Sequence, residues 1–320
     1  MKKSFGALLL LAPLLALAQD YPNRAVHMII PFAPGGASDF VGRIIQPGLE
    51  QALGQSIVID NRPGASGNIG MAAAAHATPD GYTIYLGNVG TVAINPGVFT
   101  KLDVHPTRDL IAITQVVDVP GVLIANPSFP PRSVRELVEY VKAHPGAVNY
   151  ASPGSGSQNR LEMEKLRNAA GLNMVHVPYK GGAGPAVTGL VTGETQIMFV
   201  TASSAMPMIK AGRLKVLAVT APKRLAPLPD VPTMTESGFP SIAFSSWLGF
   251  FAPAHVPQDV VKRLANGIAD ATAHGEAQQS ILKFAMEPAA MTPVGFAATL
   301  KADLERWGPI VKASGFSAED

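Results

Sequence analysis

The chain has 320 residues, no cysteine and a formal net charge of +2, and 47% of its residues are hydrophobic. A chain of this length and apolar content suggests two domains with sizeable cores, and the lack of cysteine excludes disulfides and thiolate chemistry. The nearly balanced charge offers no basic field for nucleic acid or anionic lipid, so we expect no nucleic acid partner.

The first 18 residues have the pattern of a secretory signal peptide. Lys2 and Lys3 precede an apolar run over residues 7–17, and the small residues at 16–18 suggest cleavage before Gln19. The run is shorter than the roughly 18 residues that a membrane-spanning helix needs. Without its two signal-peptide lysines the chain would carry 23 basic and 23 acidic residues. We therefore expect a secreted, soluble and nearly neutral mature protein.

Strand-like and helix-like segments alternate along the mature chain. The apolar run 26–30 predicts a buried strand, and apolar side chains then recur at helical spacing from Phe40 to Leu53. Ser133 and Glu136 form a capping box that predicts a helix over residues 133–146. Such alternation predicts an α/β fold whose mainly parallel sheets carry helices on both faces. Further strands are expected at 56–60, 82–88, 110–117, 121–126, 147–152, 174–179, 195–200, 214–220 and 243–253, and further helices at 69–76, 158–171, 184–193, 204–212, 258–274, 276–286 and 294–313.

Three loops share one design: each follows a strand, is rich in glycine and serine, and leads into a helix. They span residues 31–40, 150–161 and 177–187. Glycine lets the backbone approach a ligand, and the free N–H groups at a helix start can hold a carboxylate or phosphate without a basic side chain. Ligands of open α/β sheets bind at these strand ends. The alternative is that the loops are ordinary turns whose serines only cap helices.

Motifs typical of enzymes are missing. Neither Ser66 nor Ser155 lies in a nucleophile elbow, and the chain contains no phosphate-binding glycine fingerprint and no closely spaced histidine pair. We therefore expect no enzymatic activity, no cofactor and no metal site. Asp39 could be a catalytic carboxylate, but its position favours a role in capping the helix and tying the loop to nearby N–H groups. The pattern is that of a binding protein.

Six segments in order resemble the Bug receptors, the TctC-like periplasmic solute receptors of tripartite tricarboxylate transporters. They read YPNRAVHMIIPFAPGGASD, IVIDNRPGASGNIG, DGYTIYLGN, VPYKGGAGPAV, IKAGRLKVLAVT and LPDVPTMTESGFP, and the likeness extends over nearly the whole mature chain. The resemblance implies a two-domain, type II periplasmic-binding-protein fold of the Venus flytrap kind, closing by a hinge over a ligand in the cleft. We place residues 19–120 plus 244–320 in one domain and 121–243 in the other, with crossovers near 117–122 and 243–250.

The resemblance also implies the site. The loop after the first strand would hold a ligand carboxylate together with ordered water, and three other loops and a hinge strand would complete the cleft. Trp247 could wall the cleft beside Tyr179 or pack within the hinge strand. The expected ligand-binding residues are Phe32, Ala33, Gly35, Gly36, Ala37, Ser38, Asp39, Asn88, Gly90, Thr91, Ser152, Gly154, Ser155, Gly156, Ser157, Tyr179, Gly181, Gly182, Thr201 and Trp247.

One departure from the family pattern bears on the ligand. Many relatives carry Asp or Asn just after the strand that ends in MF, where this chain has Val200, Thr201 and Ser203. An amino-acid ligand is therefore less expected than a plain dicarboxylate, a tricarboxylate or an aromatic carboxylate. We expect a monomeric receptor that delivers its ligand to the membrane permease. The alternatives are a receptor without its own permease, which feeds a sensor or scavenges, and a hydrolase acting in the same cleft.

Overall fold

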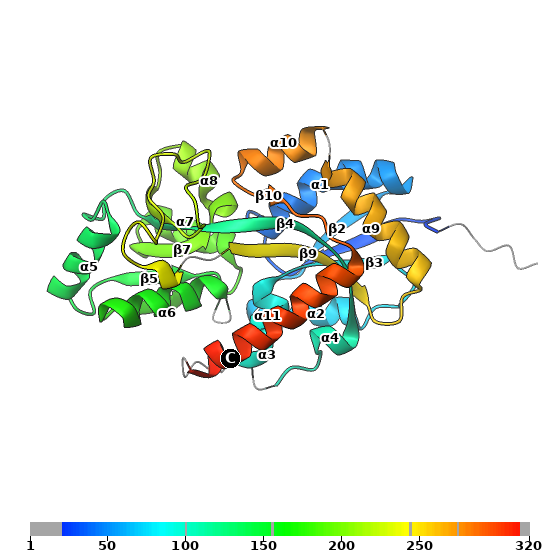
Figure 1. The fold of residues 1–320 in the computed structure, drawn as a ribbon, viewed down its shortest axis with the longest axis horizontal. Coiled ribbons are helices and arrows are strands. Elements are labelled where there is room, and N and C mark those ends of the chain that lie inside the picture. Colours follow the sequence, from blue (N-terminus) through cyan, green and yellow to red (C-terminus); the bar gives the residue numbers. More distant parts are fainter. Residues whose placement is uncertain (1–20, 100, 155–156, 243–244, 274, 314–320) are drawn as a thin grey trace, which may run out of the picture.

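The computed structural model describes residues 21–99, 101–154, 157–242, 245–273 and 275–313. Figure 1 shows two lobes side by side, each with strands covered by helices. The strands are β1 Val26–Ile30, β2 Ile57–Asn61, β3 Thr83–Asn88, β4 Leu110–Ala125, β5 Asn149–Ser152, β6 Val175–Pro178, β7 Ile197–Thr201, β8 Lys215–Val219, β9 Ser245–Pro253 and β10 Glu287–Pro288. The helices are α1 Ala37–Leu53, α2 Asn68–Ala75, α3 Asn95–Val98, α4 Pro106–Asp109, α5 Val134–Ala143, α6 Gln158–Ala170, α7 Ala183–Thr192, α8 Ala202–Lys210, α9 Gln258–Ala273, α10 Gly275–Lys283 and α11 Pro293–Ala313.

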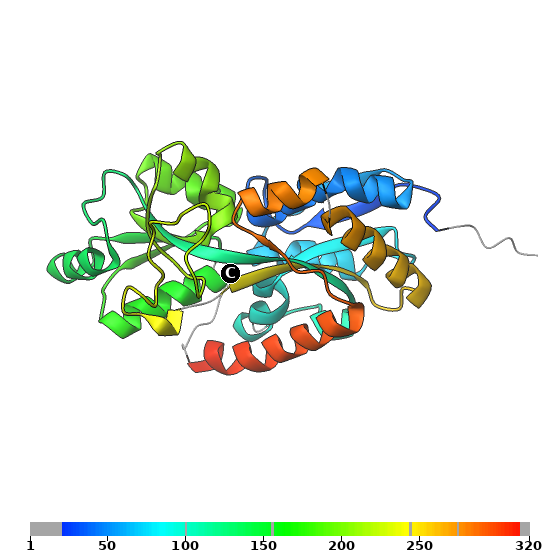
Figure 2. The same cartoon turned by 45° about the horizontal axis from the view of Figure 1, so that its top comes forward.

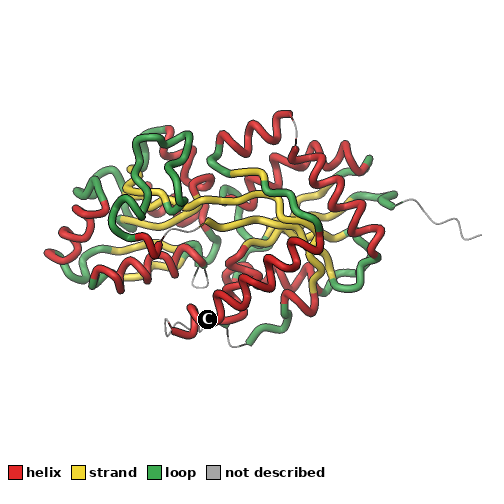
Figure 3. The backbone as a smooth tube through the Cα atoms, viewed as in Figure 1, coloured by secondary structure: helices red, strands yellow, loops and turns green. Residues whose placement is uncertain are grey.

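We call the part built from β1–β3, β9, β10, α1–α4 and α9–α11 the first lobe, and the part built from β5–β8 and α5–α8 the second lobe. The strand β4 belongs to both. Its residues up to Pro120 pair with β9, where Pro120 lies opposite Ser245, and from Gly121 onwards it pairs with β7 and β8. Figure 3 shows this strand running from one lobe into the other. The partner change falls at the predicted first crossover, while the domain boundaries themselves stay a prediction.

The predicted α/β two-lobed fold is observed, but both sheets are mixed rather than mainly parallel. The outer pairs β1–β2, β1–β3, β5–β6 and β5–β7 are parallel. The pairs that involve β4 or β9 are antiparallel. The reason is the crossover itself: β9 returns along β4 in the opposite direction, and β7 and β8 also run against β4. The overall strand order is β2-β1-β3-β9-β4-β7-β5-β6, with β8 and β10 attached to β4.

Each sheet lies between two layers of helices, as Figure 2 shows for the first lobe with α1 and α10 above and α11 below. The first lobe buries one apolar cluster between its sheet and helices α1 and α9, and another under α2 and α11. The second lobe buries one cluster under α5 and α6 and one under α7 and α8. Within the described residues, no helix combines the length and hydropathy that a membrane crossing requires.

Local sequence signals account for the helix that leads to the site. Val41, Ile45 and Leu49 recur every four residues along α1 and are fully buried, and Gly54 ends the helix in a left-handed conformation. Half of the capping box also forms: the Ser133 hydroxyl accepts the N–H of Glu136 at 3.2 Å, while the Glu136 carboxylate accepts the N–H of Arg132 at 2.9 Å instead of that of Ser133. The short elements at Gly90–Ile94, α3, α4 and β10 were not predicted.

Candidate functional site

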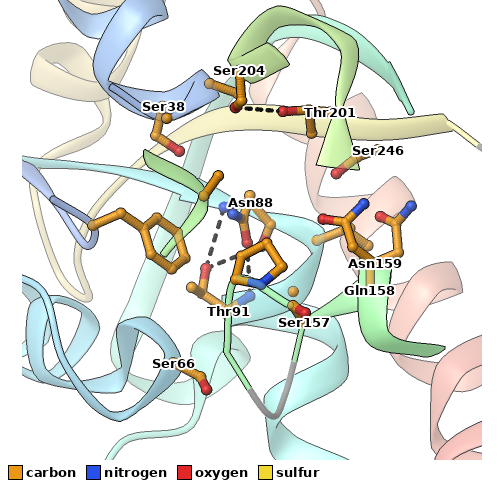
Figure 4. Close-up of a pocket in the computed structure, with 17 residues that line it drawn as sticks. Ser38, Ser66, Asn88, Thr91, Ser157, Gln158, Asn159, Thr201, Ser204 and Ser246 are labelled. Carbon is orange, nitrogen blue, oxygen red and sulfur yellow. Dashed lines mark hydrogen bonds between the residues drawn. The ribbon is translucent and has the colours of Figure 1, made fainter. Parts of the chain in front are cut away.

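A cavity lies between the lobes, where the glycine- and serine-rich loops meet. It holds about 600 Å³ of empty space, counted with its opening to solvent. Figure 4 shows polar side chains from both lobes around this space. The first lobe contributes Phe32, Gly36, Ala37, Ser38, Ser66, Asn88, Val89, Gly90, Thr91 and Ser246, and the second contributes Pro153, Ser157, Gln158, Asn159, Ala183, Thr201 and Ser204.

Helix starts, rather than charged side chains, set the electrostatics of the cavity. Among the described residues, none of those lining it carries a charge. Instead α1, α6, α7 and α8 all begin there, since Ala37, Gln158, Ala183 and Ser204 lie in their first turns and line the cavity. First-turn N–H groups lack partners within the helix, and each helix dipole adds roughly half a positive charge at its start. The cavity therefore offers N–H donors and positive potential to an anion.

Asp39 shapes the loop ahead of α1. The residue is 4% exposed, and its Oδ2 accepts the N–H of Gly35 at 3.1 Å. Arg43 Nε lies 3.1 Å from both carboxylate oxygens, and Asn61 Nδ2 donates to Oδ1 at 3.2 Å. The expected tie to nearby N–H groups is thus present, but Asp39 is not the N-cap residue of α1. The N-cap residue is Gly36, and no side chain caps the helix there. Asp39 acts from within the first turn.

The turn after β3 is fixed by two polar side chains. The N–H of Thr91 donates to Asn88 Oδ1 at 2.9 Å, and the Thr91 hydroxyl donates to the Asn88 carbonyl at 3.0 Å (Figure 4). Because the Oδ1 atom of Asn88 is engaged, its Nδ2 group is the part that remains to donate to a ligand.

Hydrogen bonds also hold the polar groups that come from the second lobe. The Ser157 hydroxyl caps α6 by accepting the N–H of Arg160 at 3.3 Å. The hydroxyls of Thr201 and Ser204 are 2.7 Å apart at the start of α8. These groups are therefore oriented before any ligand arrives, which lowers the entropic cost of binding.

The loop before α1 and the loop before α7 contact each other directly across the cleft. The N–H of Ala33 donates to the carbonyl of Gly181 at 3.1 Å. A Cβ added at Gly184 would lie 2.5 Å from the carbonyl oxygen of Pro34, and one added at Gly182 would lie 2.9 Å from the Phe32 ring. Such approaches require glycine, so the two backbones pack without side chains between them. The cleft is closed on this side.

Comparison with known proteins identifies the family. The model of the tripartite tricarboxylate transporter family receptor matches residues 41–316. Protein BugT of Bordetella pertussis is 33% identical over 301 residues, which cover 93% of this chain and 91% of BugT. The chain belongs to the tripartite tricarboxylate transporter receptor family.

Solved structures of similar proteins share the fold of this receptor. An R. palustris protein, solved with adipate, is 31% identical with a TM-score of 0.90 and covers 93% of this chain and 99% of its own. MatC from Rhodopseudomonas palustris, solved with bound malate, is also 31% identical, with a TM-score of 0.85 and coverages of 91% and 100%. The expected Bug-type, two-domain receptor is therefore confirmed.

The receptor brings many of the predicted site residues to the cavity. Those that line it are Phe32, Gly36, Ala37, Ser38, Asn88, Gly90, Thr91, Ser157 and Thr201. Ala33, Gly35, Asp39, Gly181 and Gly182 lie behind the wall, where they form or support the contact between the two loops. Ser155 and Gly156 lie outside the described residues. Which residues contact a ligand stays a prediction.

Ser152 and Gly154 support the cavity from behind instead of lining it. Ser152 is fully buried, with its hydroxyl 2.7 Å from His176 Nε2 and donating to the Gly154 carbonyl at 3.0 Å. Burial, helped by Arg160 and Arg167, lowers the pKa of His176 to about 3, so the imidazole is neutral. Ser152 thus fixes the loop before α6.

Tyr179 and Trp247 do not line the cavity, contrary to the expectation that they would. The Tyr179 ring packs within the second lobe, and its hydroxyl occupies the space that Gly189 leaves without a side chain. Trp247 is 5% exposed in the first lobe, packs edge-on against Phe296 and donates from Nε1 to Asp303 Oδ2 at 2.6 Å. Of the two alternatives for Trp247, packing within the hinge strand is the one observed.

Several lining residues were missed, and three of them had detectable signals. Successive side chains of a strand face opposite sides of the sheet, so Ser246 and Trp247 cannot both face the cavity. Trp247 was predicted to do so, but Ser246 is the one that lines it. Gln158 and Asn159 directly follow the cap Ser157, in the first turn of α6. The full set of missed lining residues is Ser66, Val89, Pro153, Gln158, Asn159, Ala183, Ser204 and Ser246.

Proposed function

We propose that this receptor captures a small carboxylate in the cavity between its lobes. The observation that carries the proposal is the convergence of four helix starts on a cavity whose described lining residues are uncharged. N–H groups and hydroxyls stabilise a carboxylate but allow it to leave again more readily than a tight ion pair would. Two relatives of the same fold were solved with the dicarboxylates adipate and malate.

The first turns of α1 and α7 are the proposed seat of the carboxylate. Gly36, Ala37 and Ala183 present backbone there, and Ser38 and Asn88 add side-chain donors. Ordered water can bridge the remaining distance to acids of different length. We propose that the lining residues predicted from the sequence contact the ligand directly or through such water.

We further propose that the mature receptor is a periplasmic monomer that delivers the acid to the permease subunits of a tripartite tricarboxylate transporter. The family description and the signal-peptide pattern of residues 1–18, with cleavage before Gln19, support this. Residues 19–120 plus 244–320 would then move against residues 121–243 as the cleft opens and closes. The partner change of β4 between Pro120 and Gly121 supports that division.

A panel of mono-, di-, tri- and aromatic carboxylates, titrated while the melting temperature is measured, tests carboxylate capture. A ligand that binds only the folded protein raises its melting temperature. A panel without any shift would remove the carboxylate proposal. Gly36→Leu should abolish the shift by filling the seat, whereas Gly308→Leu on the open side of α11 should not. Unchanged affinity in Gly36→Leu would place the site elsewhere.

Delivery to the permease is tested separately, by measuring uptake of the identified acid in cells with and without the receptor gene. Loss of uptake is expected in the deletion strain. Uptake that persists at the same rate at limiting concentrations of the acid would favour the receptor without its own permease.

A further inference from the structure

Gln158 places an unpaired hydrogen-bond acceptor in the wall of the cavity. It is the first residue of α6, only 5% exposed, and its side chain lines the cavity. Its Nε2 group donates to Glu162 Oε1 at 2.8 Å, while its Oε1 atom is buried and has no hydrogen-bond partner among the described residues. A buried carbonyl without a partner is unfavourable, so this atom points to a group that arrives with the ligand.

The orientation of the Gln158 amide follows from its neighbour. Glu162 is 3% exposed and one turn further along α6, and its second oxygen accepts Asn159 Nδ2 at 3.1 Å. A carboxyl oxygen that accepts from Gln158 requires the nitrogen of the amide to face Glu162, and the oxygen must then face away. Figure 4 shows the oxygens of Gln158 and Asn159 on the side of the other lining residues and the nitrogens on the far side.

The chemistry of this acceptor restricts the ligand. An ionised carboxylate has only acceptor atoms and would be repelled by Oε1, so it belongs at the helix starts of α1 and α7 instead. An ammonium group could donate to Oε1, but the described lining residues include no carboxylate to balance its charge in a buried site. A hydroxyl group donates one hydrogen bond and carries no charge, which fits an uncharged wall.

We propose that Gln158 Oε1 accepts a hydrogen bond from a hydroxyl group of the ligand, so that the receptor prefers hydroxy acids over the matching acids that lack the hydroxyl. This inference rests on the proposed carboxylate capture and adds a specificity determinant to it. A ligand hydroxyl pairs the otherwise orphaned acceptor, and an acid without one leaves it unpaired or dependent on water.

Two matched pairs of probes test the preference in the wild-type protein: malate against succinate, and 2-hydroxyglutarate against glutarate. Each pair differs by one hydroxyl group at constant chain length. Calorimetric titration at pH 7.5 should give at least about tenfold tighter binding for the hydroxy acid of the pair whose length fits the cavity. Aspartate, which carries an ammonium group in place of the malate hydroxyl, should bind more weakly than malate.

The variant Gln158→Met keeps the length of the side chain but removes the acceptor. We expect its hydroxy-to-deoxy affinity ratio to fall to near one, mainly through weaker binding of the hydroxy acid. The matched control is Gln46→Met. Gln46 is a half-buried glutamine of α1 that donates to the Ile57 carbonyl of β2, and its variant should keep the wild-type ratio.

The outcomes separate the two proposals. Equal binding within both pairs, with affinity for all four acids, would overturn the hydroxyl preference while leaving carboxylate capture intact. Tighter binding of aspartate than of malate would assign the donor to an ammonium group and would also overturn it. A wild-type ratio retained in Gln158→Met would remove Gln158 as the determinant. If no acid of either pair or of the wider panel bound, carboxylate capture itself would fail and the preference with it.

Discussion

Gly184 lies so close to the carbonyl oxygen of Pro34 that a Cβ at position 184 would come within 2.5 Å of it. The two residues belong to different lobes, so under the proposed hinge motion the approach would exist only while the cleft is closed. We expect Gly184→Ala to disfavour closure and to weaken ligand binding at least about tenfold. Alanine suits the helical position, so the free energy of unfolding without ligand should stay the same or rise by about 0.5–1 kcal/mol.

Calorimetry and urea denaturation of Gly184→Ala measure both quantities. Gly308→Ala is the control, because a Cβ at Gly308 meets open space. It should raise stability by a similar amount and leave affinity unchanged. Wild-type affinity in Gly184→Ala would show that binding does not need this contact.

Asp39 should contribute to stability through the loop that it holds. Asp39→Ala removes the acceptor for Gly35, Arg43 and Asn61 in a buried setting, so we expect the free energy of unfolding to fall by about 1–3 kcal/mol. Ligand affinity should fall as well, because Gly35 then loses its tether. Asp60→Ala breaks the exposed ion pair with Arg62 and should cost less than about 0.5 kcal/mol in urea denaturation. Equal losses in both variants would contradict the structural role of Asp39.

Glu162 should make the stability of the ligand-free protein depend on pH. Burial raises the pKa of Glu162 to about 8 from its ordinary value of 4.5, against the opposing effect of Asn159 and Gln158. Between these pH values the folded protein keeps a proton that the unfolded chain has released. The contribution of this group to the free energy of unfolding therefore falls as pH rises, by up to about 1.4 kcal/mol per pH unit.

Glu162→Gln cannot ionise and should remove this dependence. Urea denaturation of both proteins at pH 5, 6, 7 and 8 gives the difference directly, and other titrating groups cancel in it. The free energy of unfolding of the variant should rise relative to that of the wild type as pH rises. Parallel curves over this range would mean that Glu162 titrates near its ordinary pKa.

Trp247 should matter for stability and not for binding. Trp247→Phe removes the hydrogen bond to Asp303, a carboxyl whose pKa burial already raises. We expect the free energy of unfolding to fall by about 1–3 kcal/mol with the affinity for the ligand unchanged. Denaturation and titration on the same preparation check this. If the affinity for the ligand fell while the free energy of unfolding stayed at the wild-type value, Trp247 would instead be a residue that lines the cleft.

The sequence predicts the elements whose signals are local. The burial of Val41, Ile45 and Leu49 follows from their spacing, and the helix at Ser133 starts where the capping box puts it. The continuity of β4 does not follow, because Pro120 and Gly121 read as a break between two apolar runs. Proline lacks an N–H, but it is tolerated here because the strand changes partners at this point.

The site, too, could be predicted from the sequence only where its signals are local. The composition of the glycine- and serine-rich loops places the cavity, because small residues and helix starts are visible in the sequence. The direction of a single side chain depends on its neighbours in space. Tyr179 turns away from the cavity because Gly189 leaves room for its hydroxyl, and the two are ten residues apart. Likewise, the unpaired oxygen of Gln158 depends on the contact with Glu162.

The proline at the partner change of β4 has a mechanical consequence. Because Pro120 has no N–H, it donates no hydrogen bond to the ladder with β9, so one fewer backbone hydrogen bond resists bending at this point. In the proposed opening and closing of the cleft, the ladders on either side would stay paired, and the lobes would turn about the short segment that β4 and β9 share. The proposed ligand, a molecule of only a few carbon atoms, would then move half of the protein by bending one short segment of two strands.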